Sequence, residues 1–297
     1  MRVFVTGAAG FIGRGVVQEL LSNDHQVLGL AHHDASAEAI TRAGAEPHRG
    51  SLEDIESLKS GAKAADSVIH LAFIHDFSDF ARVTAVDRAA IEAMGEVMAG
   101  TGKPLVIASG TMNMPKGNLA TEDTEPVRNT PFSDRVRSED LVYTLSKEKQ
   151  IRGSVVRLTP TVHGAEDKGL IPQLINMARQ KGFVTYIGDG SARWPAVHRL
   201  DAAVLFRLVL EKGTAGATYH AVAEQGVPMK DIMTVVGKHL QLPVEGKPLD
   251  EALGTIGFFA HLVGSDNPTS SEKTQRELGW HHTQPGLLAD MEANYFS

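Results

Sequence analysis

The chain lacks cysteine altogether, and it has no long apolar run among its 297 residues. The absence of cysteine excludes disulfides, thiolate metal ligands and a cysteine nucleophile. No stretch is long enough to cross a bilayer as a helix. No charged and apolar leader precedes the first apolar strand. We therefore expect a cytoplasmic protein that has no membrane partner.

A strong positive charge is also lacking. Acidic residues number 36 against 29 basic ones, which gives a formal net charge of −7. No basic run is interleaved with aromatic residues, so nucleic acid is not an expected partner. The 13 histidines are scattered without H-E-x-x-H spacing, and we expect no metal site.

A glycine-rich turn follows the first apolar run. Residues 2–6 are typical of a short strand and residues 14–21 of a helix, with Gly7, Gly10 and Gly13 between them. These glycines permit a tight turn, close approach of a pyrophosphate and packing of the helix on the strand. The helix N-terminus adds free N–H groups and a positive dipole end. The pattern predicts a dinucleotide site; the alternative is an ordinary glycine-rich loop.

Apolar runs alternate with helical patterns through the first half of the chain. This alternation predicts an α/β fold, a Rossmann-type doubly wound parallel sheet with its ligand at the carboxyl ends of the strands. After the first strand and helix, we expect strands at 26–31, 46–49, 67–73, 104–109 and 154–158, and helices at 35–43, 55–60, 79–99 and 133–150.

The second half is less regular and predicts a small, mainly helical C-terminal substrate domain. We expect residues 1–160 to form the dinucleotide-binding domain, to which 199–222 return, and residues 161–198 and 223–297 to form the small one. Its elements are a helix at 171–180, strands at 183–187 and 194–198 around the turn 188–190, and three or four helices after 229. A helix at 201–211 and a last sheet strand at 217–221 complete the large domain.

The end of the second strand indicates which dinucleotide binds. An acidic residue there favours NAD, because it accepts hydrogen bonds from the ribose, whereas a cation suits the 2′-phosphate of NADP. Asp34 lies a few residues beyond the position from which an acidic side chain would reach the ribose, and it is better placed as a helix N-cap. His32 or His33 can donate to a phosphate. We predict NADP(H) rather than NAD(H); the alternative is that both histidines are solvated.

Five segments carry a family resemblance: residues 6–13, 70–72, 109–111, 157–164 and 194–201. In these the chain resembles the extended type of the short-chain dehydrogenase/reductase superfamily, and above all its atypical, epimerase/dehydratase-like members. The resemblance implies a nicotinamide dinucleotide bound by Gly7, Gly10, Phe11, Ile12, Gly13, His32, Ser51, Leu52, Leu71, Ala72 and Pro160.

In that superfamily a serine or threonine after the fifth strand holds the substrate oxygen, and a tyrosine acts beside a lysine four residues on. By resemblance Thr111 takes the hydroxyl position, with Ser109 as its neighbour; the alternative is that both only open a loop. Tyr143 and Lys147 match the Y-x-x-x-K pattern. They would lie about 15 Å along a helix that starts near residue 133, too far from the strand ends. We interpret the match as chance.

Residues 131–139, where the pair should stand, contain neither tyrosine nor lysine. Arg135 is best placed to replace the lysine as a fixed cation, although it cannot release a proton; a surface salt bridge is the alternative. Thr111 could relay a proton from water, and His75 and His163, which follow the fourth and sixth strands, are candidates to supply it directly. For each histidine a structural role is the alternative.

Phe73, Trp194 and His198 are candidates for the substrate wall, although Trp194 also suits the core and His198 a link between the domains. The resemblance implies an NAD(P)H-dependent reductase of a ketone or aldehyde, paired as a homodimer through the helices at 79–99 and 133–150. The alternatives are a nucleotide-sugar or sterol epimerase, dehydratase or dehydrogenase, and a non-catalytic NADP-binding sensor.

Overall fold

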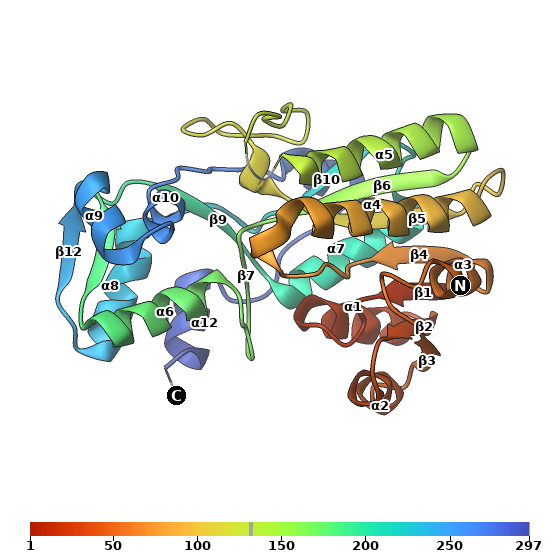
Figure 1. The fold of residues 1–297 in the computed structure, drawn as a ribbon, viewed down its shortest axis with the longest axis horizontal. Helices are drawn as coiled ribbons and strands as arrows, with labels where there is room; N and C mark the ends of the chain where they lie inside the picture. The colour runs from red at the N-terminus through yellow and green to blue at the C-terminus, as the bar shows by residue number, and fades with distance from the viewer. Residues whose placement is uncertain (131–132, 297) are drawn as a thin grey trace.

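The computed structural model describes residues 1–130 and 133–296, with only the backbone of Phe77. Its main layer is a sheet of seven parallel strands, which confirms the predicted Rossmann-type architecture (Figure 1). Across the sheet the order is β3 (Glu46–Arg49), β2 (Gln26–Ala31), β1 (Arg2–Thr6), β4 (Ser67–His70), β5 (Pro104–Gly110), β6 (Arg152–Leu158) and β10 (Thr218–Ala221).

Helices cover both faces of this sheet because its strands are apolar on both sides. In β1, Val3 and Val5 join the core on one face, while Phe4 joins the core on the other. The first face is covered by α1 (Phe11–Ser22), α2 (Asp34–Arg42) and α7 (Arg199–Lys212). The second is covered by α3 (Ile55–Lys63), α4 (Phe80–Val97) and α5 (Asp134–Lys149).

The smaller unit has two sheets of its own and a separate apolar core. β7 (Thr161–His163), β9 (Arg193–His198) and β11 (Glu224–Pro228) form one sheet, and β8 (Val184–Ile187) pairs with β12 (Val244–Lys247) in the other. The helices are α6 (Leu170–Lys181), α8 (Met229–Leu240), α9 (Leu249–Ile256), α10 (Phe259–Val263) and α12 (Leu287–Asn294). The expected strands at 183–187 and 194–198 exist, but they belong to different sheets and do not pair with each other.

The fourth strand ends earlier than expected, and the reason lies in its neighbour. Thr6 pairs with His70, and the chain beside it then turns away at Gly7. Residues 71–73, which we expected to continue β4, therefore have no strand alongside on that edge. They are left at the carboxyl end of the sheet, where a ligand would bind.

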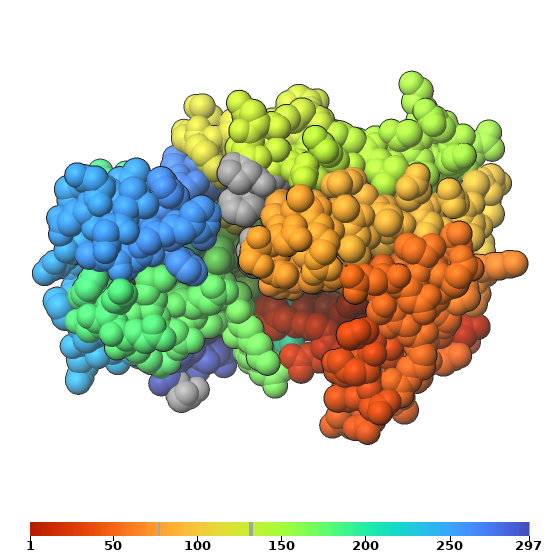
Figure 2. Space-filling model, in the orientation of Figure 1, coloured from red at the N-terminus to blue at the C-terminus, as the bar shows by residue number. Residues whose placement is uncertain are grey.

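The C-terminal part of the chain returns to the large unit. α11 (Glu272–Leu278) is followed by Trp280, which is fully buried and donates from its indole to the carbonyl of Asp201. Figure 2 shows the surface hollowed where the two units face each other, with the red N-terminal segment at the floor of the hollow.

Candidate functional site

The turn between β1 and α1 forms a cradle for a phosphate. Gly7 has a φ of +71°, and a Cβ there would lie 2.8 Å from the amide nitrogen of Ala72. A Cβ on Gly13 would lie 1.9 Å from the carbonyl oxygen of Gly7. Gly10 is the N-cap of α1 and offers no side-chain cap, so the first N–H groups of the helix are left for an anion. The residues therefore fit a pyrophosphate.

The other residues expected around a dinucleotide lie at the carboxyl edge of the same sheet. Phe11 and Ile12 open α1, and Ser51 and Leu52 follow β3. Leu71 and Ala72 follow β4, and Pro160 lies between β6 and β7. All seven are partly exposed, as contact with a ligand requires.

The end of β2 has a cation that the sequence pattern did not reveal. Arg49 is the last residue of β3, beside β2, and its guanidinium contacts the carboxylate of Asp34. The expectation that Asp34 caps α2 is wrong, because the N-cap is His33, whose Nδ1 accepts from the amide of Ser36 at 3.1 Å. His32 is exposed beside them. Asp34 is thus neutralised by Arg49, and His33 has a structural role.

Three predicted residues meet where β4 and β5 end. Arg135, in the first turn of α5, donates from Nη2 to the carbonyl of Ala108 at 2.7 Å, and its Nη1 lies 2.7 Å from Asp87 Oδ1. Its guanidinium carbon is 4.2 Å from the centre of the Phe73 ring, and the His75 ring meets that ring edge-on at 5.9 Å. Only 16% of the Arg135 side chain is exposed. Arg135 is a fixed, inward-facing cation and not a surface salt bridge.

The environment of His75 changes its acidity. Partial withdrawal of the ring from water lowers the His75 pKa below its ordinary value of 6.5, and the charge of Arg135 lowers it further. A hydrogen bond with the backbone of Phe73 opposes this shift. A lowered pKa makes the imidazolium a stronger acid, but it also leaves a smaller fraction of His75 protonated at neutral pH.

Thr111 lies beneath the surface. It opens the short helix η2 (Thr111–Asn113) after β5, is fully buried, and accepts a hydrogen bond from Asn267 Nδ2 at 3.3 Å. Its neighbour Ser109 donates to the buried carboxylate of Glu139 at 2.6 Å. Both hydroxyls are therefore engaged with protein groups, and Thr111 can reach a substrate only if the chain around Asn267 moves.

Tyr143, the tyrosine of the Y-x-x-x-K match, lies far from the carboxyl ends of the sheet strands. α5 begins at Asp134, as expected, so Tyr143 lies about 14 Å along the helix axis. Its hydroxyl is 2.6 Å from Thr218 Oγ1, at the amino end of β10. Burial, and then the charge of Glu139, raise the Tyr143 pKa to about 12. These contacts support the interpretation that Tyr143 and Lys147 match by chance.

Three predicted site residues lie inside the small unit or at its junction. Trp194 is 2% exposed and donates from its indole to a carbonyl of α10, so its expected place in the substrate wall is wrong. His198 caps α7 by accepting from the amide of Leu200, which makes it a structural residue and not part of that wall. His163 is fully buried, with Nδ1 2.8 Å from Asp290 Oδ2. This burial and the Asp290 contact favour the structural role that was the alternative for His163.

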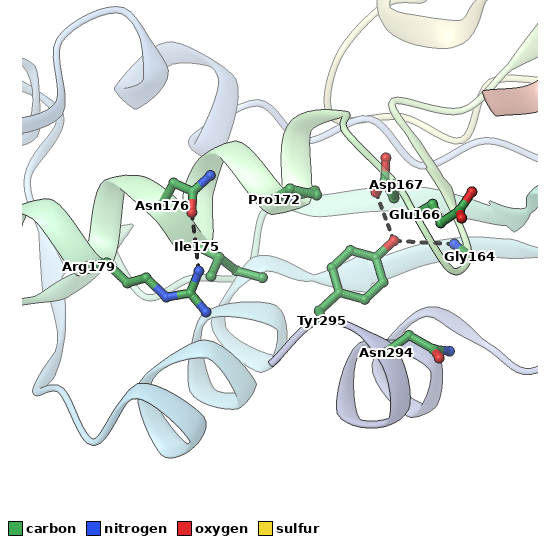
Figure 3. A pocket seen from close by; sticks show the side chains of 9 residues that line it. All are labelled: Gly164, Glu166, Asp167, Pro172, Ile175, Asn176, Arg179, Asn294 and Tyr295. Carbon is green, nitrogen blue, oxygen red and sulfur yellow. Dashed lines mark hydrogen bonds between the residues drawn. The ribbon is translucent and has the colours of Figure 1, made fainter. Parts of the chain in front are cut away.

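A cavity of about 140 Å³ lies in the small unit between the loop after β7, α6 and α12 (Figure 3). The Tyr295 hydroxyl donates to Asp167 Oδ2 at 2.7 Å and accepts from the amide of Gly164 at 3.2 Å. Asn176 and Arg179 line it from α6. The lining includes none of the predicted catalytic residues, so we place the candidate site at the carboxyl end of the sheet instead.

Two further findings apply to the part of the chain that the structure describes. In residues 1–130 and 133–296, no group of three or more histidine, aspartate or glutamate side chains is arranged to hold a metal ion. None of the helices in the same ranges combines the length and apolar character needed to cross a membrane.

Comparisons with known proteins agree with this geometry. The model of the NAD dependent epimerase/dehydratase family matches residues 3–223. An uncharacterized protein of Schizosaccharomyces pombe is 46% identical over 298 residues and covers 100% of both chains. A 4-hydroxy-2-methyl-3-oxo-4-farnesyl-3,4-dihydroquinoline-1-oxide ketoreductase of Stigmatella aurantiaca is 24% identical, covering 94% of this chain and 92% of its own. The structure of DesIV, a dTDP-glucose 4,6-dehydratase of Streptomyces venezuelae with NAD and TYD bound, has a TM-score of 0.80 at 19% identity, covering 99% and 96% of the two chains.

Proposed function

The chain belongs to the NAD dependent epimerase/dehydratase family, and from that premise we propose that it is an NADPH-dependent reductase of a ketone or aldehyde. The observation that carries this proposal is the arrangement of Phe73, His75 and Arg135 beside the glycine cradle. The arrangement supplies a fixed cation and an ionisable imidazole, without a tyrosine–lysine pair. The ketoreductase relative of Stigmatella aurantiaca supports carbonyl reduction.

The roles of the residues follow from their chemistry. The glycine turn and the start of α1 would hold the pyrophosphate of the dinucleotide, whose nicotinamide supplies hydride when it is bound. Arg135 stabilises the negative charge that develops on the carbonyl oxygen. His75 donates the proton from its imidazolium form, which burial and the Arg135 charge make a stronger but less populated acid. Thr111 orients the same oxygen once its surroundings open.

The preference for NADPH rests on the end of β2. Asp34 is the acidic residue closest in sequence to the ribose position, and Arg49 neutralises it. His32 and Arg49 are both exposed there and can meet a 2′-phosphate. A site for NAD would instead offer a carboxylate with no cation on it.

We expect Arg135→Met to lower kcat/KM for carbonyl reduction about 100-fold, because an electrostatic contact with the developing oxyanion is typically worth that much. NADPH oxidation by wild type and variant is measured against a panel of ketones and aldehydes. The matched control is Arg137→Met, on the same helix, with a side chain that is 68% exposed.

Equal activity of the Arg135 and Arg137 variants would remove Arg135 from the mechanism. A wild-type protein that binds NADPH tightly but reduces none of the carbonyls would instead favour a non-catalytic NADP-binding sensor.

A further inference from the structure

A buried chain of polar groups leads from the glycine turn to Arg135. Thr6 is the last residue of β1, His70 the last of β4, and Asp87 lies inside α4; each of their side chains is at most 1% exposed. Thr6 Oγ1 is 2.8 Å from His70 Nδ1, and His70 Nε2 is 3.2 Å from Asp87 Oδ1. Asp87 Oδ1 then lies 2.7 Å from Arg135 Nη1.

From Thr6 to Asp87, the hydrogen-bond donors and acceptors of this chain can be satisfied in one way. The amide of Ala72 donates to Thr6 Oγ1 at 3.2 Å, so the threonine proton is free to point at His70 Nδ1. His70 then carries its proton on Nε2 and donates it to Asp87. The His70 ring is therefore held through both nitrogens. It links Thr6, at the end of the strand that precedes the glycine turn, to the Asp87 carboxylate beside Arg135.

Asp87 is a buried anion. Burial is the largest single influence and raises the pKa of Asp87, but the Arg135 charge and the hydrogen bonds from His70 and Ser138 act together against it and outweigh it. The Asp87 pKa is therefore held well below its ordinary range. The second carboxylate oxygen accepts from Ser138 Oγ at 2.6 Å. Because both oxygens are held, the carboxylate has a fixed orientation.

We propose that Asp87 is the positioning residue of this enzyme: it holds the guanidinium of Arg135 against Phe73 at the ends of β4 and β5, where the substrate carbonyl is reduced. Ser138 and the pair Thr6–His70 fix Asp87 in turn. This inference rests on the role of Arg135 in the proposed function. Asp87 acts only through Arg135 and does not touch substrate.

A double-mutant cycle tests the proposal with Asp87→Asn, Arg135→Met and the two combined. We expect Asp87→Asn to lower kcat and raise the carbonyl KM, at least tenfold in kcat/KM, with the NADPH Kd changed less than twofold. In the Arg135→Met background the same substitution should change kcat/KM less than twofold. Glu92→Gln, on the exposed side of α4, is the control that should match wild type.

Equal losses from Asp87→Asn in both backgrounds would overturn the positioning role, as would no loss in either. Such a result leaves the proposed function intact if Arg135→Met itself is impaired. Unchanged activity of Arg135→Met would instead refute the role of Arg135, and the positioning role with it.

Folding is monitored by circular dichroism, because Asp87→Asn leaves a buried cation without its carboxylate. The double variant lacks both charges and avoids that penalty. If Asp87→Asn does not fold, Ser138→Ala takes its place, since it removes only the 2.6 Å hydrogen bond to Asp87. Ser138→Ala should lower kcat/KM two- to fivefold in wild type and leave Arg135→Met unchanged; the same loss in both overturns the positioning role.

Discussion

At the scale of single residues, this site depends on how a few charges are paired. Arg135 is paired inward with Asp87, which leaves a fixed cation facing Phe73. Arg49 is paired with Asp34 at the surface, where both side chains are largely exposed and the pair contributes little to stability. Arg49 can therefore leave Asp34 for a stronger anion at little cost.

Arg49→Ala tests that exchange. We expect the Kd for NADPH to rise about 10- to 100-fold, because hydrogen bonds to a charged phosphate are worth about 1.5–3 kcal/mol. The Kd for NADH should change little. Calorimetric titration of both cofactors measures the ratio, and Arg42→Ala, on the exposed surface of α2, is the control.

An equal loss of affinity for both cofactors would contradict the proposed preference. Tighter binding of NADH than of NADPH by the wild type would do the same.

At the scale of elements, the sequence patterns predicted most of the sheet, because hydrophobic period and glycine positions act locally. The predicted bounds of β2 and β3 match the structure, and the glycine turn stands where expected. Pairing was less predictable: the strands at 183–187 and 194–198 resembled a hairpin but found partners distant in sequence. The predicted strand at 67–73 ended at His70 because its neighbour turns at Gly7.

Gly13→Ala tests the cradle as an element. The added methyl would lie 1.9 Å from the Gly7 carbonyl oxygen, so the turn must distort. We expect loss of measurable NADPH binding in calorimetry, with the far-UV circular dichroism largely kept. Gly254→Ala in α9, where a Cβ meets nothing within 4 Å, should bind NADPH normally and be up to about 1 kcal/mol more stable.

If Gly13→Ala bound NADPH within a few-fold of the wild type, the turn would not be the pyrophosphate site. The proposed function would then lose its starting point.

At the scale of the whole molecule, the C-terminal segment ties the chain together through buried polar groups. His220, in β10, has Nδ1 2.8 Å from the carbonyl of Ser270, while Nε2 lies 3.5 Å from Arg157 Nη1. Arg157 is itself paired with the buried Glu139 at 2.6 Å. These contacts join the edge of the large sheet to a segment close to the C-terminus.

This buried histidine predicts a pH dependence of stability. Burial, and then the Arg157 charge, lower the His220 pKa from 6.5 to about 4. Between these values the unfolded chain binds a proton that the folded protein does not, so the free energy of unfolding falls as pH falls. Between pH 7 and pH 5, the contribution of His220 lowers the free energy of unfolding by about 2 kcal/mol.

Urea denaturation at the two pH values measures this difference. His220→Gln should lose most of that slope, whereas His281→Gln, at an exposed position, should keep it. An unchanged slope in His220→Gln would assign the pH dependence to other groups.

Two expectations at this scale stay predictions: a cytoplasmic location and a homodimer formed through α4 and α5. The boundaries of the two units, residues 1–160 with 199–222 and the remaining segments, also stay a prediction. The family resemblance and the periodicity of the chain are their support.

The sequence by itself determined the alternation of strands and helices, the glycine turn and the absence of a tyrosine–lysine pair where family members have one. These features depend on neighbouring residues and on backbone geometry, which a linear pattern records. Only the tertiary structure decided that Arg135 pairs with Asp87, that Arg49 lies beside Asp34, and that Trp194 and His163 are interior. Such contacts join residues far apart in the chain, and packing alone determines which charges meet and which side chains reach solvent.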